Sequence, residues 1–188
     1  SRLAIADKVV EAAETIGFPV VLKAVAPELL HKTERGAVAL NLKSVSELSD
    51  ALLKMSGLSD TFIVEEMITD CVAELILGVT ADPQFGQFLT IGAGGIFTEL
   101  LNDSVVLMMP VSEKKLKESI SKLGVNKLLN GWRGQPEGDS EQLIETVMFF
   151  EKFIKRNIEN LAGCEINPLI VRPSGKGVIA ADALIMMK

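Results

Sequence analysis

Apolar and polar positions alternate along this chain with two different periods, and each period predicts a different element. From Leu3 to Ile16 the apolar residues recur at helical spacing, and Gly17 and Pro19 end that pattern. The run from Phe18 to Val25 is almost continuously apolar with one lysine inside it, which is typical of a buried strand. We therefore expect the chain to begin with a helix followed by a strand.

The rest of the pattern predicts a mixture of strands and helices. A helix begins at Ser44, where SVSE forms a capping box with Glu47, and two more begin at Ser112 and Ser140. Strands are expected at 37–42, 61–67, 72–79, 87–91, 104–109, 165–171 and 178–186, the last two as a closing hairpin. This order predicts an α+β protein with two lobes rather than one doubly wound sheet.

Composition and charge narrow the classes of partner. The chain has 188 residues, of which 48% are hydrophobic and 23% charged, and its net charge is -6. An acidic chain lacks the basic surface that a nucleic-acid binder needs, so we expect no nucleic-acid partner. No apolar run reaches the ~20 residues of a membrane span, so we expect no membrane partner. Cys71 and Cys164 lie far apart without a CxxC motif, which is typical of reduced thiols in a cytoplasmic protein.

Charged and amide side chains inside apolar strands are the first candidate site residues. Lys23 interrupts VVLKAV, and it either reaches solvent at the strand edge or holds a phosphate. Glu165 and Asn167 are two residues apart on a strand and so share one face, while Asp182 lies on the next strand among apolar residues. Oxygen ligands on neighbouring strands suit Mg²⁺, although a hairpin cap or a lysine pair explains Asp182 as well.

Three further features are weaker evidence for a functional site when each is taken alone. The loop Gly92-Ala93-Gly94-Gly95 can bring backbone amides close to a phosphate, but a tight turn explains it equally, and it is neither GxGxxG nor a P-loop. Glu65 and Glu66 end a strand, where they either bind ribose and adenine or face solvent. His31 is the only histidine, and a lone histidine without metal-ligand spacing or a GxSxG motif is more often structural than catalytic.

Five segments, in their order along the chain, resemble the ATP-grasp domain of ADP-forming acyl-CoA synthetases, a family that includes the acetate–CoA ligases. They are GFPVVLKAVAPELLHKTERGAVALNL, VEEMI...AELILGVTADPQFG, IGAGGIFTELLNDSVVLMMP, GWRG and EINPLIV...GVIAADALI. Succinyl-CoA synthetase β subunits are more distantly similar. The resemblance implies an α+β ATP-grasp fold with lobes at 1–64 and 65–188 and a nucleotide site between them. It also leads us to expect that part of the first lobe precedes Ser1.

The resemblance implies a set of nucleotide-binding residues. Lys23 corresponds to a residue that contacts the phosphates of ATP or ADP. Glu65 and Glu66 lie near the hinge that holds adenine and ribose, and Gly94 and Gly95 belong to the loop near the phosphates.

A second implied set serves metal binding and phosphoryl transfer. Asn167 and Asp182 look like the Mg²⁺ ligands of the family. Glu165 is similar to a glutamate that steadies a phosphohistidine. His31 matches a histidine that carries phosphate between the acyl-phosphate site and the ATP site, and this role suits the nucleophilic imidazole nitrogen.

The implied function is the nucleotide half-reaction of an ADP-forming, acetyl-CoA-type synthetase, an acid–thiol ligase. The chain would transfer phosphate between a phosphohistidine and ADP or ATP with Mg²⁺. Its partners would be the CoA-binding and ligase domains, or an α subunit, of a larger chain or hetero-oligomer.

Three departures from the family pattern remove expected cations near an anionic site. They are the segment Gly36-Ala37-Val38-Ala39, the neighbourhood of Leu107, and the pair Thr80-Ala81. Two alternatives therefore stay open. One is a degenerate regulatory synthetase-like domain of a protein lysine acetyltransferase, and the other is an interaction domain that binds no nucleotide.

Overall fold

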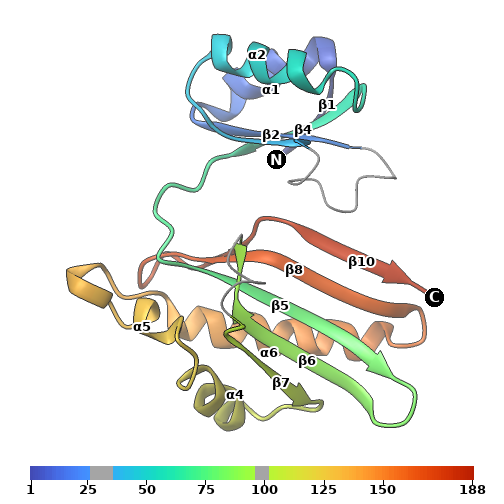
Figure 1. Ribbon diagram of the computed structural model, residues 1–188, viewed down its shortest axis with the longest axis vertical. Helices are drawn as coiled ribbons and strands as arrows, with labels where there is room; N and C mark the ends of the chain where they lie inside the picture. Colours follow the sequence, from blue (N-terminus) through green and yellow to red (C-terminus); the bar gives the residue numbers. More distant parts are fainter. Residues whose placement is uncertain (26–35, 96–101) are drawn as a thin grey trace. The chain divides into compact units, whose positions relative to one another are not determined.

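The structure is a computed structural model, and it describes residues 1–25, 36–95 and 102–188 (Figure 1). The chain divides into two compact units, Ser1–Thr69 and Asp70–Lys188. Each unit has its own cluster of buried apolar side chains. No helix in this described part of the chain is long and apolar enough to cross a membrane.

The first unit is an antiparallel sheet with two helices packed on one face (Figure 1). The strands follow the order β1 (Arg2–Ile5), β4 (Thr61–Glu66), β2 (Val20–Ala24), β3 (Val38–Leu42). The helices are α1 (Val9–Ile16) and α2 (Val45–Met55). Their apolar faces and the inward side chains of β2 and β4 form one core.

The predicted helix at the start of the chain is wrong for its first residues. Arg2–Ile5 pairs with β4 as β1, and a short 3-10 turn, η1 (Ala6–Lys8), precedes α1. Leu3 and Ile5 are exposed while Ala4 between them is buried, which is the two-residue period of a strand. Pairing with a distant strand therefore overrides the helical spacing of the apolar residues.

The predicted capping box at Ser44 is confirmed. The side chain of Ser44 accepts the N–H of Glu47 at 3.2 Å, and the carboxylate of Glu47 accepts the N–H of Lys43 at 2.8 Å. These bonds satisfy backbone donors that the first turn of a helix leaves without partners. Helix α2 ends at Met55.

The predicted division of the lobes after residue 64 passes through β4. The last two residues of β4, Glu65 and Glu66, pair with Val21 and Val20 of β2. This pairing keeps both glutamates in the first sheet, and the first unit ends at Thr69.

The second unit is built on a larger antiparallel sheet. Its strands are β5 (Ala73–Asp82), β6 (Gly86–Ala93), β7 (Ser104–Met108), β8 (Leu161–Val171), β9 (Val178–Ala180) and β10 (Ala183–Met187). They follow the order β10-β8-β5-β6-β7, and β9 pairs with β8. The closing hairpin is confirmed, although β8 begins four residues earlier than predicted, at Leu161 rather than Glu165.

Helices cover one face of this second sheet (Figure 1). They are α4 (Glu113–Ile120), α5 (Asn126–Leu129) and α6 (Ser140–Asn157), and a 3-10 turn, η3 (Trp132–Gly134), joins the last two. The helices that the sequence predicted at Ser112 and Ser140 are thus present. Apolar residues of α4, α5 and α6 pack with Leu75, Leu77, Leu89 and Ile91 of the sheet. The alternate residues of each strand point to the other face, called here the outer face.

Candidate functional site

In the first unit, Lys23 and Glu65 form an ion pair. They lie on neighbouring strands, with Lys23 opposite Ile63 and Glu65 opposite Val21, so the two side chains are diagonal neighbours on one face of the sheet. The ammonium nitrogen is 2.5 Å from a carboxylate oxygen of Glu65. Lys23 is only 8% exposed. A lysine held this way at the face of a strand is not a solvated surface residue.

Glu66 is separated from this pair. Successive strand residues point to opposite faces, so Glu65 shares a face with Lys23 and Glu66 does not. Glu66 is exposed at the end of β4. The structure thus brings together only two of the three predicted nucleotide-binding residues of this unit.

In the second unit, Asn167 and Asp182 are directly opposite each other. The N–H of Asn167 donates to the carbonyl of Asp182 at 3.1 Å, and this bond continues the pairing between β8 and the β9–β10 segment. Opposed residues of an antiparallel pair have Cβ atoms about 5 Å apart on the same face. The backbone bond thus places the two residues that the sequence singled out at opposed positions of neighbouring segments.

A bulge occurs at Asn167. On β5, Leu75 pairs with Leu169 and Leu77 pairs with Ile166. The one β5 residue between these pairs, Ile76, therefore faces two β8 residues, Asn167 and Pro168. Proline has no N–H to give to a ladder, and bulges re-aim the side chains next to them. The Asn-Pro pair within EINP thus breaks the regular ladder where the predicted metal ligand lies.

Glu165 lies on the same outer face of β8. It is opposite Gly78 of β5 and opposite Leu184 of β10. A Cβ added to Gly78 would come within 3.9 Å of the Cγ of Glu165, so the glycine leaves the space beside this side chain open. Glu165 and Asn167 thus lie on β8, and Asp182 lies between β9 and β10 opposite Asn167.

The turn at Gly94 and Gly95 follows β6 and passes over β5. A Cβ on Gly94 would collide with the backbone of Leu75 and Ile76, so only glycine permits this approach. The N–H of Gly94 donates to the carbonyl of Glu74 at 2.8 Å, and the N–H of Gly95 donates to the side-chain oxygen of Asn167 at 2.9 Å. Both amides are thus used within the protein, and the glycines supply close packing and a positive φ at Gly95.

Two polar residues of this region were not singled out from the sequence. The carboxylate of Glu74 lies against Gly95, at the place where a Cβ would be. Asp103, which follows the segment 96–101, accepts the N–H groups of Gly124 and Val125 at 2.7 Å each. Glu74 is the one acid inside the apolar run VAELILGV. It therefore shows the same pattern as Lys23, a single charged residue inside an apolar strand.

The oxygen donors on the outer face fit a hard divalent cation. Mg²⁺ takes carboxylate and carbonyl oxygens and completes its shell with water and phosphate. Among the described residues, no three side chains of His, Cys, Asp and Glu gather into a metal site by themselves. The oxygens of an asparagine amide and an aspartate carboxylate are of the type that Mg²⁺ accepts alongside water and phosphate.

His31 lies outside the described residues, so its role stays a prediction. All three departures lie on described residues: the segment 36–39 leads into β3, Thr80 and Ala81 are near the end of β5, and Leu107 is in β7. Leu107 is buried in the core of the second unit, opposite Leu89, and its side chain faces the helices. An arginine at that position would not reach the outer face. Its neighbours Val106 and Met108 do point outward and are exposed.

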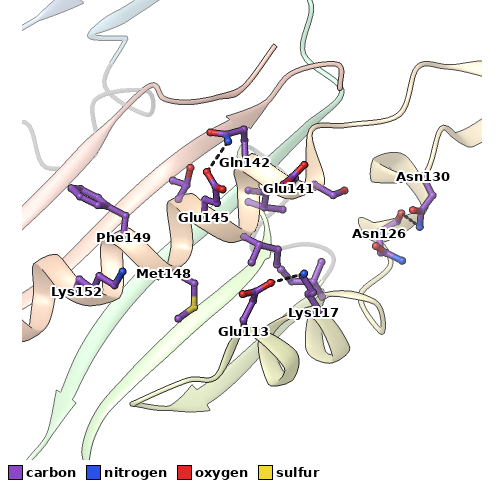
Figure 2. A pocket seen from close by; sticks show the side chains of 15 residues that line it. Glu113, Lys117, Asn126, Asn130, Glu141, Gln142, Glu145, Met148, Phe149 and Lys152 are labelled. Carbon is purple, nitrogen blue, oxygen red and sulfur yellow. Dashed lines mark hydrogen bonds and ion pairs between the residues drawn. The ribbon is translucent and has the colours of Figure 1, made fainter. Parts of the chain in front are cut away.

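A groove of about 950 Å³ lies beside α4 and α6 and is separate from these residues (Figure 2). Its walls carry local pairs, such as Lys117 with Glu113 and Gln142 with Glu145. None of the described residues that line it is a site residue predicted from the sequence. The helices cover the face of the sheet opposite to Asn167 and Asp182, so this groove is not the candidate site.

Comparison with known proteins identifies the family of this chain. The family described as "ATP-grasp domain" matches residues 2–187. The chain belongs to the ATP-grasp family. This ATP-grasp domain is 32% identical to the β subunit of acetate–CoA ligase [ADP-forming] II of Pyrococcus furiosus, over 97% of this chain and 80% of that subunit.

Longer enzymes contain a similar ATP-grasp domain. 4-Hydroxybutyrate–CoA ligase [ADP-forming] of Nitrosopumilus maritimus is 31% identical over 94% of this chain, which corresponds to 26% of that enzyme. This chain therefore spans about a quarter of that relative. It is the β-subunit-like portion of a ligase, and its relatives are subunits or domains of larger enzymes.

A solved relative has the same fold. It is acetyl-coenzyme A synthetase 1 of Ca. Korarchaeum cryptofilum in complex with coenzyme A and Mg-AMPPCP, with its phosphohistidine segment pointing towards the nucleotide binding site. The TM-score is 0.82 at 33% identity, over 100% of this chain and 84% of that chain. These relatives are synthetases and ligases, and they give no support to the regulatory acetyltransferase alternative.

Proposed function

We propose that this ATP-grasp domain performs the nucleotide half-reaction of an ADP-forming acyl-CoA synthetase. In that half-reaction a phosphoryl group leaves a histidine nitrogen, whose P–N bond breaks, and joins an oxygen of the ADP β-phosphate. The products are neutral histidine and ATP, and the reaction runs in both directions. The complete reaction is acyl-CoA + ADP + phosphate ⇌ carboxylate + CoA + ATP, and it needs the other domains or subunit of the enzyme.

The observation that carries this proposal is the similarity to the Pyrococcus furiosus β subunit over nearly the whole chain. The geometry within each unit supports it. Lys23 provides a fixed cation on a sheet face for the phosphates, and Glu65 is the anionic partner beside it. Asn167 and Asp182 provide neutral and anionic oxygen ligands on one face. Mg²⁺ at these ligands would neutralise charge on the phosphates during transfer.

The remaining predicted residues have supporting roles in this proposal. His31 carries the phosphoryl group, and Glu165 steadies a phosphohistidine. Glu66 lies at the strand end, where its exposed carboxylate can bind ribose hydroxyls. Gly94 and Gly95 belong to the loop near the phosphates.

Two measurements test the proposal. Calorimetry with MgADP and MgATP should detect binding to the full chain, and the absence of both heat and a thermal shift would overturn the proposal. Reconstitution with the CoA-binding domains should then give acyl-CoA-dependent ATP formation. Full activity of a His31→Ala variant in that assay would remove His31 from the phosphoryl pathway.

A further inference from the structure

We propose that Asn167 positions the glycine turn at Gly95, so that one side-chain oxygen links this turn to the predicted metal ligands. Only the consequence for nucleotide binding rests on the proposed function. The positioning itself is a property of the second unit alone.

The first observation is how the turn leaves the sheet. The ladder between β5 and β6 continues one residue beyond β6, where the N–H of Gly94 donates to the carbonyl of Glu74. At the next residue the backbone has turned over β5, and Gly95 has a φ of +67°. Its N–H no longer faces a strand, and the side-chain oxygen of Asn167 accepts it at 2.9 Å.

The second observation is that Glu74 packs against the same glycine. Its carboxylate lies where a Cβ of Gly95 would be, so the α-carbon is enclosed on that side. The turn is thus held by the backbone of Glu74, by the side chain of Glu74 and by the side chain of Asn167. Of these, only Asn167 also lies opposite Asp182.

The amide oxygen of Asn167 can make two contacts at once. A carbonyl oxygen of asparagine has two lone pairs, so it can accept one N–H and still face a cation. Asn167 can therefore hold Gly95 with or without metal. Asp182, whose carboxylate accepts the N–H of Ala183 at 3.0 Å, is assigned to the metal in this proposal.

The two residues should consequently respond differently to substitution. Loss of the Asn167 side chain releases Gly95 even in the absence of ligands. Loss of the Asp182 charge weakens the metal site and leaves the turn in place. A role of Asn167 restricted to metal binding would make the two variants equivalent.

Hydrogen–deuterium exchange of the ligand-free full chain tests this difference. We expect Asn167→Ala to accelerate exchange of the Gly95 amide by about 3- to 10-fold, the range that one neutral hydrogen bond contributes. Asp182→Asn should leave that exchange unchanged, and Asn167→Asp should restore it because the aspartate keeps an acceptor. Amides of α6 serve as the internal reference for global stability.

Calorimetry without metal gives the second readout. In EDTA, Asn167→Ala should weaken ADP binding by about 3- to 10-fold, whereas Asp182→Asn should leave it unchanged or tighter. With Mg²⁺ present, both variants should bind more weakly than the wild type. If Asn167→Ala does not fold, Asn167→Ser takes its place, because its shorter hydroxyl does not reach Gly95.

Two results would overturn the inference. One is unchanged exchange at Gly95 in Asn167→Ala, and the other is equal acceleration in Asp182→Asn. A wild-type chain that binds no nucleotide would overturn the proposed function instead, and the exchange comparison would still decide whether Asn167 positions the turn.

Discussion

The ammonium of Lys23 is 2.5 Å from the carboxylate of Glu65 on the neighbouring strand of the first unit. Lys23 is 8% exposed, and its position on a sheet face gives its charge a fixed direction. An anionic phosphate that binds this ammonium has to share it with Glu65. Substitution of Lys23 therefore tests whether its ammonium binds the nucleotide.

We expect Lys23→Met to weaken MgADP binding by about 10- to 150-fold, because a charge-assisted hydrogen bond contributes about 1.5–3 kcal/mol. Calorimetry measures the change. Lys54→Met removes an exposed lysine near the end of α2 and is the matched control, for which no change is expected. Equal affinity of Lys23→Met and wild type would show that Lys23 does not hold the nucleotide.

Gly94 should not tolerate a side chain. Its Cβ would meet the backbone of Leu75 and Ile76, so Gly94→Ala should lower the free energy of unfolding by about 1–3 kcal/mol, as overpacking does. Gly57→Ala is the control, because a Cβ at Gly57 has nothing within 4 Å. Denaturant melts of the two variants give the comparison, and equal stability would contradict the close approach of the turn to β5.

A bidentate ion pair within the second unit should make stability depend on pH. Both carboxylate oxygens of Asp70 accept from the guanidinium of Arg172 at 2.8 Å, and these hydrogen bonds hold the pKa of Asp70 below its ordinary value. A lowered folded-state pKa gives stability above the unfolded-state pKa, and this stability is lost as pH falls through the folded-state value.

Asp70→Asn should accordingly lower Tm at pH 7 and lose this effect at strongly acidic pH, where both proteins carry a neutral group. Thermal melts from pH 2 to pH 7 measure the difference. Asp50→Asn changes an exposed carboxylate of α2 and controls for net charge. A Tm difference between Asp70→Asn and wild type that does not shrink in acid would contradict the ion-pair explanation.

Cys71 should react slowly although it is exposed. Partial burial, followed by the charges of Glu74 and Asp70, raises the pKa of its thiol to about 11. At pH 8 this leaves about a hundredfold less thiolate than an ordinary cysteine has, and the thiolate is the reactive form.

Iodoacetamide labelling should therefore rise steeply between pH 8 and pH 11. Glu74→Gln should increase the rate at pH 8 because it removes one of the charges that raise the pKa of Cys71. A Cys71→Ser variant controls for labelling of the buried Cys164. A labelling midpoint near pH 8.5 would show that the surroundings of Cys71 do not raise its pKa.

The sequence was most informative where a local rule and the tertiary structure agree. The capping box at Ser44 and the serine cap at Ser112 lie where they were predicted, because a few adjacent residues determine a helix start. Leu3 to Ile5 was predicted wrongly because its conformation depends on β4, nearly sixty residues away. A periodicity of so few residues cannot report a distant pairing partner.

The candidate site shows the same limit. Glu165 and Asn167 could be placed on one face from their spacing, and the hairpin brought Asp182 opposite Asn167. The bond from Gly95 to Asn167 spans 72 residues and requires the turn to pass over β5, which no local pattern predicts. Glu74 was overlooked although it had the same signal as Lys23, a single charge in an apolar strand.

The most direct test of the account uses the fact that the chain contains one histidine. The full chain is incubated with Mg²⁺ and ATP carrying a labelled γ-phosphate. We expect an acid-labile, alkali-stable phosphoryl group that returns to ATP when ADP is added and that is absent from His31→Ala. Equal labelling of His31→Ala, or no labelling of a wild-type chain that binds MgATP, would contradict this expectation.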